Sequence, residues 1–237
     1  MSLPSYKSEF LTACSQAGAL KFGSFVLKSK RVSPYFFNAG LFHKFNLSSR
    51  ISAAFAETLH AYAQENAQFD FDVLFGPAYK GIVLAATTGE SLARIDEGKY
   101  GDKSWSYNRK EAKDHGEGGS IVGESLKGKR IVIIDDVITA GTAIREAIQM
   151  IKKEGGEIVG IVVAVDRQEK QVPKEGEGKD DDGKPRPSAI GQLRKELGVP
   201  VMAIITLDDV VEFVKSKGSE EELNAMEAYR GKYRASD

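Results

Sequence analysis

The stretch IVIIDDVITAGTA, residues 131–143, decides the fold of this chain. It opens with a continuous run of β-branched residues, which is typical of a strand that is buried on both faces. Two adjacent acids, Asp135 and Asp136, follow that run, and a turn of small residues then leads into an apolar pattern of helical period. The order of strand, acids, turn and helix predicts a unit whose strand carries a binding site at its carboxyl end.

The same alternation continues on both sides of this stretch. FDVLFG (71–76) precedes a helical pattern at 81–94, and EIVGIVVAVD (157–166) precedes another at about 190–197. VPVMAIITL (199–207) adds one more strand. Because continuous Val, Ile and Leu runs alternate with helices, we expect an α/β fold with a central, mostly parallel sheet flanked by helices.

Residues 1–45 depart from that alternation. Apolar residues at helical spacing predict a first helix, and KFGSFVLK (21–28) with SPYFFNAG (33–40) predicts a hairpin. Ser48 or Ser49 is expected to cap the long helix that follows. We therefore expect a small N-terminal hood, made of a helix and a hairpin, within a single domain that spans the 237 residues.

The composition excludes several classes of function. Hydrophobic residues make up 41% and charged residues 28%, as in ordinary globular proteins, and the formal net charge of -1 gives no electrostatic reason to expect nucleic acid or a membrane as partner. Cys14 is the only cysteine, so no internal disulfide or cysteine-pair zinc site is expected. The longest apolar runs are too short to span a bilayer. We expect a cytoplasmic protein.

Two segments lack apolar periodicity. YNRKEAKDHGEGGS (107–120) is charged and rich in glycine, which predicts a mobile loop. QEKQVPKEGEGKDDDGKPRP (168–187) is more polar still, and we expect it to be an exposed, partly disordered insertion.

The turn at 139–143 is suited to binding a phosphate. Small residues with a glycine let backbone N–H groups converge on an anion, and the start of the following helix adds partial positive charge. Asp135 and Asp136 would repel a phosphate, so we expect them to accept hydrogen bonds from vicinal ribose hydroxyls. Together these features predict a ribose 5-phosphate site. A simple exposed turn, or a Mg²⁺ site only, is the alternative for the acidic pair.

A second anion site is predicted at FGPAYKGI, residues 75–82. This stretch is no Walker A loop, because Lys80 precedes the second glycine instead of following it. A glycine-proline turn with a lysine at the start of a helix nevertheless favours an anion, with Tyr79 and Lys80 as the candidate residues. An ordinary turn with a solvated lysine remains the alternative.

The loop at 107–120 carries four candidate donors, which are Arg109, Lys110, Lys113 and His115. Cations that close over a departing, highly charged group would stabilise the charge that develops and exclude water. His115 could assist proton transfer or could simply donate to a phosphate. A solvated charged loop is the alternative interpretation.

Two of these motifs resemble a known family. VIIDDVITAGTA resembles the PRPP-binding motif of the type I phosphoribosyltransferases, and YNRKEAKDHGEGG resembles the catalytic loop of the orotate phosphoribosyltransferases. The resemblance implies the type I phosphoribosyltransferase fold, Mg²⁺ bound mainly through PRPP without a dedicated set of protein ligands, and a homodimer whose loop crosses to the neighbouring site. It implies catalytic roles for Lys28, Lys113, His115 and Asp136. The PRPP-binding residues that it implies are Lys28, Tyr79, Lys80, Arg109, Lys110, Lys113, His115, Asp135, Asp136, Val137, Ile138, Thr139, Ala140, Gly141, Thr142 and Ala143.

Orotate is a flat ring with a carboxylate, so its pocket needs apolar walls and a cation. The resemblance assigns orotate to Phe36, Phe37, Thr139 and Arg167. Adjacent residues of a strand point to opposite faces, so only one of the two phenylalanines can face the core. The chain departs from the family at Lys30, where the family usually has glycine.

The implied activity is transfer of ribose 5-phosphate from PRPP to orotate, which yields orotidine 5-monophosphate and pyrophosphate. Two other functions are compatible with the PRPP motif alone. One is a purine phosphoribosyltransferase with another hood and loop. The other is a PRPP-sensing regulator that binds nucleic acid, which the acidic balance of the chain disfavours.

Overall fold

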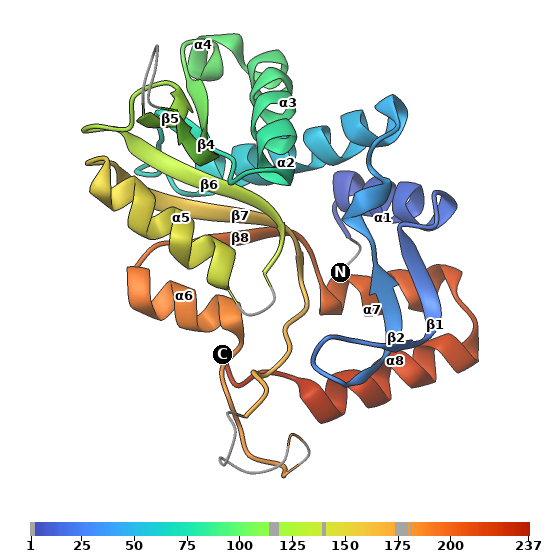
Figure 1. Ribbon diagram of the computed structural model, residues 1–237. Coiled ribbons are helices and arrows are strands. Elements are labelled where there is room, and N and C mark those ends of the chain that lie inside the picture. Colours follow the sequence, from blue (N-terminus) through green and yellow to red (C-terminus); the bar gives the residue numbers. More distant parts are fainter. Residues whose placement is uncertain (1–2, 114–118, 139–140, 174–179, 181) are drawn as a thin grey trace.

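The computed structural model describes residues 3–113, 119–138, 141–173, 180 and 182–237. Within them, six strands form the central sheet in the order β5-β4-β3-β6-β7-β8 (Figure 1). Neighbouring strands are parallel except β5, which is antiparallel to β4. The strands are β3 (Val73–Phe75), β4 (Ser104–Lys113), β5 (Gly119–Gly123), β6 (Arg130–Val137), β7 (Glu157–Asp166) and β8 (Val201–Thr206).

Helices cover both faces of this sheet (Figure 1). Ile131 and Ile133 of β6 pack in one apolar cluster with α5 (Thr142–Lys153) and α6 (Ala189–Leu197). Val132 and Ile134 pack in the other cluster, with α2 (Phe45–Glu65) and α3 (Lys80–Ile95). The central strand is therefore buried on both faces, as its sequence predicts. A short helix, α4 (Glu97–Tyr100), precedes β4.

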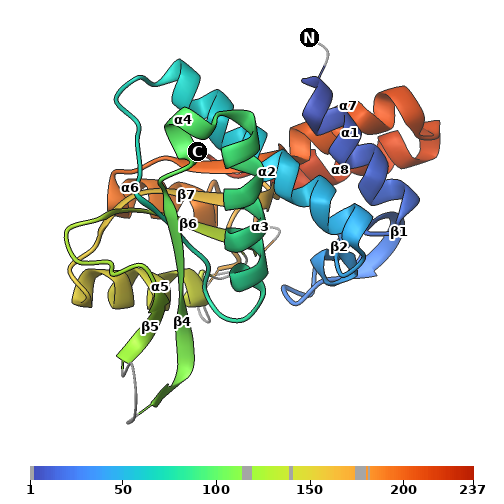
Figure 2. The ribbon, with the colours of Figure 1, turned by 90° about the horizontal axis from the view of Figure 1, so that it is seen from above.

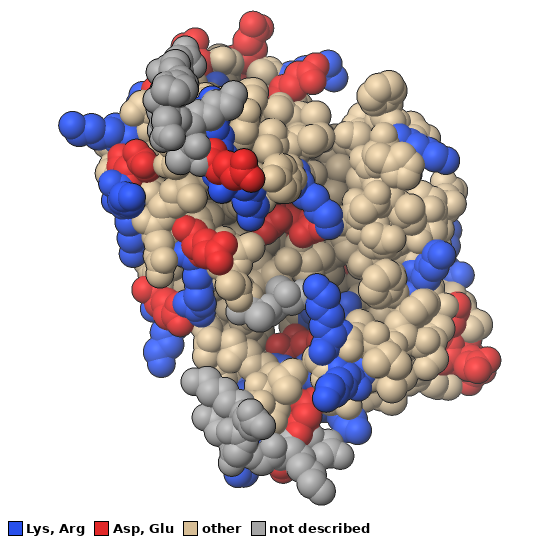
Figure 3. All heavy atoms as spheres, in the orientation of Figure 1, with Lys and Arg blue, Asp and Glu red and all other residues tan. Residues whose placement is uncertain are grey.

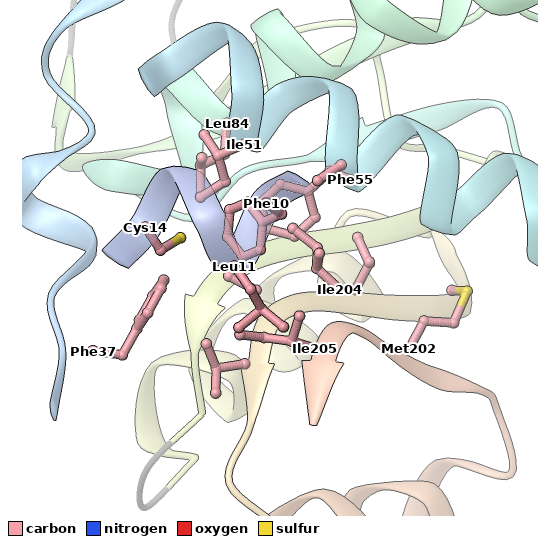
Figure 4. Packing of buried hydrophobic residues seen from close by; sticks show 14 of the residues in the cluster. Phe10, Leu11, Cys14, Phe37, Ile51, Phe55, Leu84, Met202, Ile204 and Ile205 are labelled. Carbon is pink, nitrogen blue, oxygen red and sulfur yellow. The ribbon is translucent and has the colours of Figure 1, made fainter. Parts of the chain in front are cut away.

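The hood contains α1 (Ser5–Gln16), the hairpin of β1 (Leu20–Val26) and β2 (Val32–Phe37), and the short helix η1 (Ala39–Leu41). It forms a lobe beside the sheet together with α7 (Leu207–Lys217) and α8 (Glu220–Tyr233), as Figure 2 shows. Side chains of α1 and β2 share one apolar cluster with α2 and β8. Figure 4 shows the members Phe10, Leu11, Cys14, Phe37, Ile51, Phe55, Leu84, Met202, Ile204 and Ile205.

The expected start of the long helix is wrong. The long helix α2 begins at Phe45 and not after Ser48 or Ser49, and no side chain caps its first turn. The first residue, Phe45, is 94% exposed, and the buried apolar face of the helix begins at Leu47. No helix among the described residues is both long and apolar enough to cross a bilayer.

The segment 107–120, expected to be a loop, contributes to two strands instead. β4 continues to Lys113 and β5 begins at Gly119, with Tyr107 paired to Val122. The two strands pair with each other, so cross-strand hydrogen bonds compensate for the missing apolar alternation. Residues 114–118 lie outside the described part of the chain.

The polar insertion at 168–187 is held more closely than the sequence suggests. Lys170 is only 5% exposed and forms a bridge with Ser188. Asp180 forms an ion pair with Arg31, which lies in the turn between β1 and β2. Residues 174–179 and 181 lie outside the described part. Long-range ion pairing explains why local polarity did not predict this anchoring.

Lys30 occupies a left-handed conformation, with φ of 65°, in the turn between β1 and β2. Its N–H donates to the Leu27 carbonyl at 2.8 Å, and the Leu27 N–H donates to the Arg31 carbonyl at 2.9 Å. The turn therefore keeps a backbone that favours glycine, although a lysine stands there.

We predict that Lys30→Gly stabilises the protein. Glycine removes the steric cost of a Cβ in the left-handed region, and its larger loss of chain entropy offsets part of that gain, which leaves about 0.5 to 1 kcal/mol. The free energy of unfolding from chemical denaturation measures the change. Lys30→Ala, which removes the long side chain but keeps the Cβ, is the control. Equal stabilisation by both variants would contradict the backbone explanation.

Candidate active site

Two of the predicted motifs meet at the carboxyl edge of the sheet. β6 ends in Asp135 and Asp136, and the neighbouring strand β3 leads through a short loop into α3. The Lys80 Nζ atom lies 2.7 Å from Asp136 Oδ2. Lys80 is largely exposed and the Asp136 side chain is mostly buried. This ion pair joins the two loops that the sequence assigns to different parts of one ligand.

Asp135 is a half-buried carboxyl group in an apolar setting. Burial raises its pKa to about 6, and the adjacent charge of Asp136 acts in the same direction. The Asp136 N–H donates to Asp135 Oδ1 at 2.8 Å, which opposes the shift. The Val137 N–H donates to Asp136 Oδ1, also at 2.8 Å. Both carboxylates are therefore oriented by the backbone and keep further lone pairs for ligand hydroxyls.

The loop between β3 and α3 is shaped by two glycines. A Cβ on Gly76 would lie 1.9 Å from the Gly81 carbonyl oxygen, and a Cβ on Gly81 would lie 2.7 Å from the Gly76 carbonyl carbon. Only glycine allows this approach of the two backbones. The Ala78 N–H donates to Asn108 Oδ1 of β4 at 2.9 Å. Tyr79 is exposed at the start of α3.

The predicted phosphate turn is described only in part. Thr139 and Ala140 lie outside the described residues. Gly141 is buried and left-handed, with φ of 77°, and it immediately precedes α5. Thr142 and Ala143 are exposed at the first turn of that helix. The start of α5 is thus exposed just after the end of β6, and the N–H groups of a helix start suit an anion.

The four candidate donors of the segment 107–120 are described less completely. Arg109 is half-buried and Lys110 is exposed, and both belong to β4. The Lys113 backbone ends that strand, but its side chain lies outside the description, as does all of His115.

The hairpin separates the two candidate phenylalanines as a strand must. Phe37 is 8% exposed and packs with Phe10 and Phe42, with ring centroids 6.4 and 6.0 Å away. Phe36 is 40% exposed and contacts Phe25. Only Phe36 therefore presents its ring on the outer face. Lys28 is exposed in the turn that follows β1.

Arg167 follows β7, and three neighbouring side chains contact its guanidinium. Its guanidinium lies 2.6 Å from Glu169 Oε1, donates to Ser33 Oγ at 3.2 Å and sits 4.5 Å above the Tyr35 ring centroid. Burial by itself would lower the pKa of Arg167, but interactions with Tyr35 and then Glu169 raise it overall. The group stays charged, as a cation for a carboxylate must.

The face that carries these groups is hollowed between the sheet and the hood, and both basic and acidic side chains border the hollow (Figure 3). Sequence reasoning missed Asn108, Glu169, Tyr229 and Ser33, which orient the predicted residues. Glu169 stands two residues after Arg167, so its proximity could have been noticed. Tyr229 acts from α8, and no local pattern signals it.

Comparisons with known proteins agree with this geometry. The phosphoribosyl transferase domain matches residues 47–185. The orotate phosphoribosyltransferase of Metarhizium anisopliae is 58% identical, over 99% of this chain and 98% of its own length. That of Neurospora crassa is 56% identical, over 100% of this chain and 99% of its own length. The crystal structure of the Francisella tularensis orotate phosphoribosyltransferase superposes with a TM-score of 0.77 at 34% identity, and covers 96% of this chain and 100% of that one.

The chain belongs to the orotate phosphoribosyltransferase family. Its fold is accordingly the type I phosphoribosyltransferase fold, with the small hood of helix and hairpin that the sequence predicts. As a member of the orotate phosphoribosyltransferases it is a pentosyltransferase that acts in pyrimidine biosynthesis.

We predict that Asp135→Asn weakens PRPP binding but stabilises this orotate phosphoribosyltransferase. The raised pKa means that ionising Asp135 above about pH 6 costs folding free energy. Asparagine avoids that cost, so the free energy of unfolding should rise by on the order of 1 to 3 kcal/mol at about pH 8. The advantage should shrink as pH falls through 6 and vanish near pH 4, where the carboxyl is protonated in both states.

Denaturation curves across this pH range, together with PRPP titrations, measure the two effects. Asp102→Asn, at an exposed aspartate of a turn, is the matched control and should show no such pH-dependent advantage. A variant Asp135→Asn that binds PRPP as tightly as the parent would remove Asp135 from the ribose site.

Proposed function

We propose that transfer of ribose 5-phosphate from PRPP to orotate takes place in the hollow between the carboxyl edge of the sheet and the hood. The ion pair between Lys80 and Asp136, 2.7 Å long, is the observation that carries this placement. It brings together an anion loop and an acidic pair, which are the two kinds of group that a ribose with a pyrophosphate needs.

PRPP is proposed to lie along this edge. Its 5-phosphate meets the N–H groups and hydroxyls of residues 139–143, and its ribose hydroxyls donate to Asp135 and Asp136. Its pyrophosphate meets Tyr79 and Lys80 at the start of α3. The exposed start of α5 and the backbone-oriented carboxylates support this arrangement. When PRPP binds, Lys80 is available to exchange its carboxylate partner for a phosphate oxygen.

Orotate is proposed to lie against the hood. Phe36 supplies an exposed ring for stacking, and Arg167 supplies a fixed cation for the carboxylate. Since the Phe37 side chain is buried in the core, its proposed contact is through its backbone. Thr139 remains assigned to orotate by the family resemblance alone. Lys28, which is exposed in the turn beside β2, is assigned to PRPP near the reacting centre by the family resemblance alone.

The proposed reaction needs no covalent nucleophile. An orotate nitrogen forms a bond to one face of ribose C1 as the C1–O bond breaks on the opposite face, and pyrophosphate leaves with the bonding electron pair. The proton that the nitrogen carried passes to the departing pyrophosphate, with His115 as the candidate relay. The ribose passes through an oxocarbenium-like state, and C1 is inverted because the nitrogen approaches the face opposite to the departing pyrophosphate. Arg109, Lys110, Lys113 and His115 are proposed to close over the pyrophosphate and to stabilise its growing negative charge. Asp135 and Asp136 face the positive charge that develops on the ribose.

Mg²⁺ is proposed as the cofactor, carried mainly by oxygens of PRPP. Asp135 and Asp136 offer the hard oxygen ligands that this ion prefers, beside the proposed pyrophosphate position. When bound, the ion neutralises pyrophosphate charge and thereby improves the leaving group.

The active form is proposed to be a cytoplasmic homodimer in which the hairpin of β4 and β5 reaches the neighbouring site. Large apolar side chains on neighbouring helices support an interface, because Phe45 of α2 is 94% exposed and Val83 of α3 is 56% exposed. Tyr79, at the start of α3, is 72% exposed. Contiguous exposed apolar patches mark contact surfaces, and these three side chains are proposed to belong to one such patch.

We expect PRPP and Mg²⁺ to yield pyrophosphate with orotate and not with adenine or hypoxanthine. The reason is that Arg167 provides a cation for a carboxylate that the purines lack. A coupled pyrophosphate assay with each base measures this directly. Release with a purine base but not with orotate would overturn the proposed acceptor.

We predict that Lys113→Ala lowers kcat by roughly 10² to 10³ while PRPP affinity changes little, because its contact strengthens only as pyrophosphate leaves. Steady-state kinetics and PRPP titration separate the two quantities. Lys127→Ala, at an exposed position outside the site, is the control. An unchanged kcat would remove Lys113 from the catalytic residues.

A further inference from the structure

A buried charge network lies behind the proposed orotate site and joins Arg167 to groups that have no direct role in the reaction described above. Its centre is Glu169, whose carboxylate faces two arginines. Arg167 lies 2.6 Å from Glu169 Oε1, and Arg31 lies 3.4 Å from Glu169 Oε2. The Tyr229 hydroxyl donates to Oε1 at 2.9 Å. One carboxylate is thus shared by two cations from different parts of the chain.

Arg31 is nearly inaccessible to solvent, with 3% of its side chain exposed. A buried guanidinium is costly unless its donors and its charge are matched. Asp180 of the polar insertion supplies most of that match, because it accepts from Arg31 Nε and Nη2 at 2.6 Å each. The Lys170 carbonyl accepts from Nη2 at 2.7 Å, and the guanidinium lies 4.6 Å above the Tyr233 ring centroid.

Arg31 and Arg167 share Glu169, so the other partners of Arg31 affect Arg167. Asp180 binds Arg31 in a bidentate pair, so Glu169 is left closest to Arg167. If Asp180 were neutral, Glu169 would be the nearest anion for the buried Arg31, which already lies within 3.4 Å. Glu169 would then be drawn away from Arg167. A guanidinium binds a carboxylate well only when its planar fork is held in place.

We propose that Asp180 is a positioning residue for the acceptor base, which it controls through Arg31, Glu169 and Arg167. Asp180 then contributes to the specificity for orotate, although it does not contact the base. The proposal rests on the placement of orotate against Arg167 in the proposed function.

Asp180→Asn tests this proposal, because it keeps the shape of the side chain and removes its charge. We expect the KM for orotate to rise roughly two- to thirtyfold, with the KM for PRPP unchanged. Asp180→Glu, which restores the charge, should recover part of the loss. The matched control is Asp182→Asn in the same insertion, since Asp182 pairs with Arg186 and not with Arg31. It should behave as the parent protein does. Thermal unfolding of each variant checks that the fold is kept.

A double-mutant cycle with Arg167→Ala tests whether Asp180 acts on orotate binding through Arg167. Asp180→Asn should add no further rise in the KM for orotate once Arg167 is absent. An equal rise in both backgrounds, a rise in the KM for PRPP instead, or no change in either KM would overturn the proposal. If Arg167→Ala alone raises the KM for orotate but Asp180→Asn does not, only the role of Asp180 fails. If Arg167→Ala leaves that KM unchanged, the base site itself is wrong and the role of Asp180 falls with it.

Discussion

Burial of β6 on both faces is the constraint on which the rest of the structure depends. Its side chains divide between two apolar clusters, so helices must cover each face and the neighbours β3 and β7 must pair alongside. Each fully buried Ile or Val contributes about 1.5 to 3 kcal/mol, which makes this register costly to change. The strand is fully buried from Ile131 to Ile134 and becomes partly exposed toward its carboxyl end. The first polar residues there, Asp135 and Asp136, are consequently fixed at the edge where the loops of β3 and β6 converge.

The acidic pair at the end of the apolar strand β6 lowers the stability of the fold, while it supplies the carboxylates of the proposed site. Burial raises the pKa of Asp135, so its charged form is less favourable in the folded protein. Lys80 offsets part of the charge through Asp136, and backbone N–H groups orient both carboxylates. Ribose hydroxyls would complete the hydrogen bonding that the fold leaves open. A site of this kind is ordered before its ligand arrives, which lowers the cost of binding.

The sequence was informative where structure is local. Buried strands, the helices that follow them and the acidic pair all lie where periodicity predicts them. α7 and α8 were missed, although both begin with capping boxes, Thr206 with Asp209 and Ser219 with Glu222, which the sequence displays. The strands β4 and β5, which include the ends of the segment 107–120, were missed for another reason. They are specified by pairing with each other and not by an alternation of apolar and polar residues. The same holds for the site, because the family motifs indicated the groups that we propose to contact the ligand. The residues that orient them, such as Asn108 and Tyr229, act across 30 and 60 positions of the chain.

The hood is held in place by long-range contacts that no local sequence pattern predicts. An isolated hairpin is marginally stable, so β1 and β2 need anchors to hold Phe36 and Lys28 in place. One anchor is apolar, through Phe37 in the shared core. The other is electrostatic, through Arg31, whose partners come from the insertion and from the segment after β7. Buried ion pairs add little net stability because desolvation offsets their attraction, but breaking one leaves a costly unpaired charge. Such a network therefore contributes fixed geometry more than stability, and fixed geometry is what recognition of a small planar acid requires.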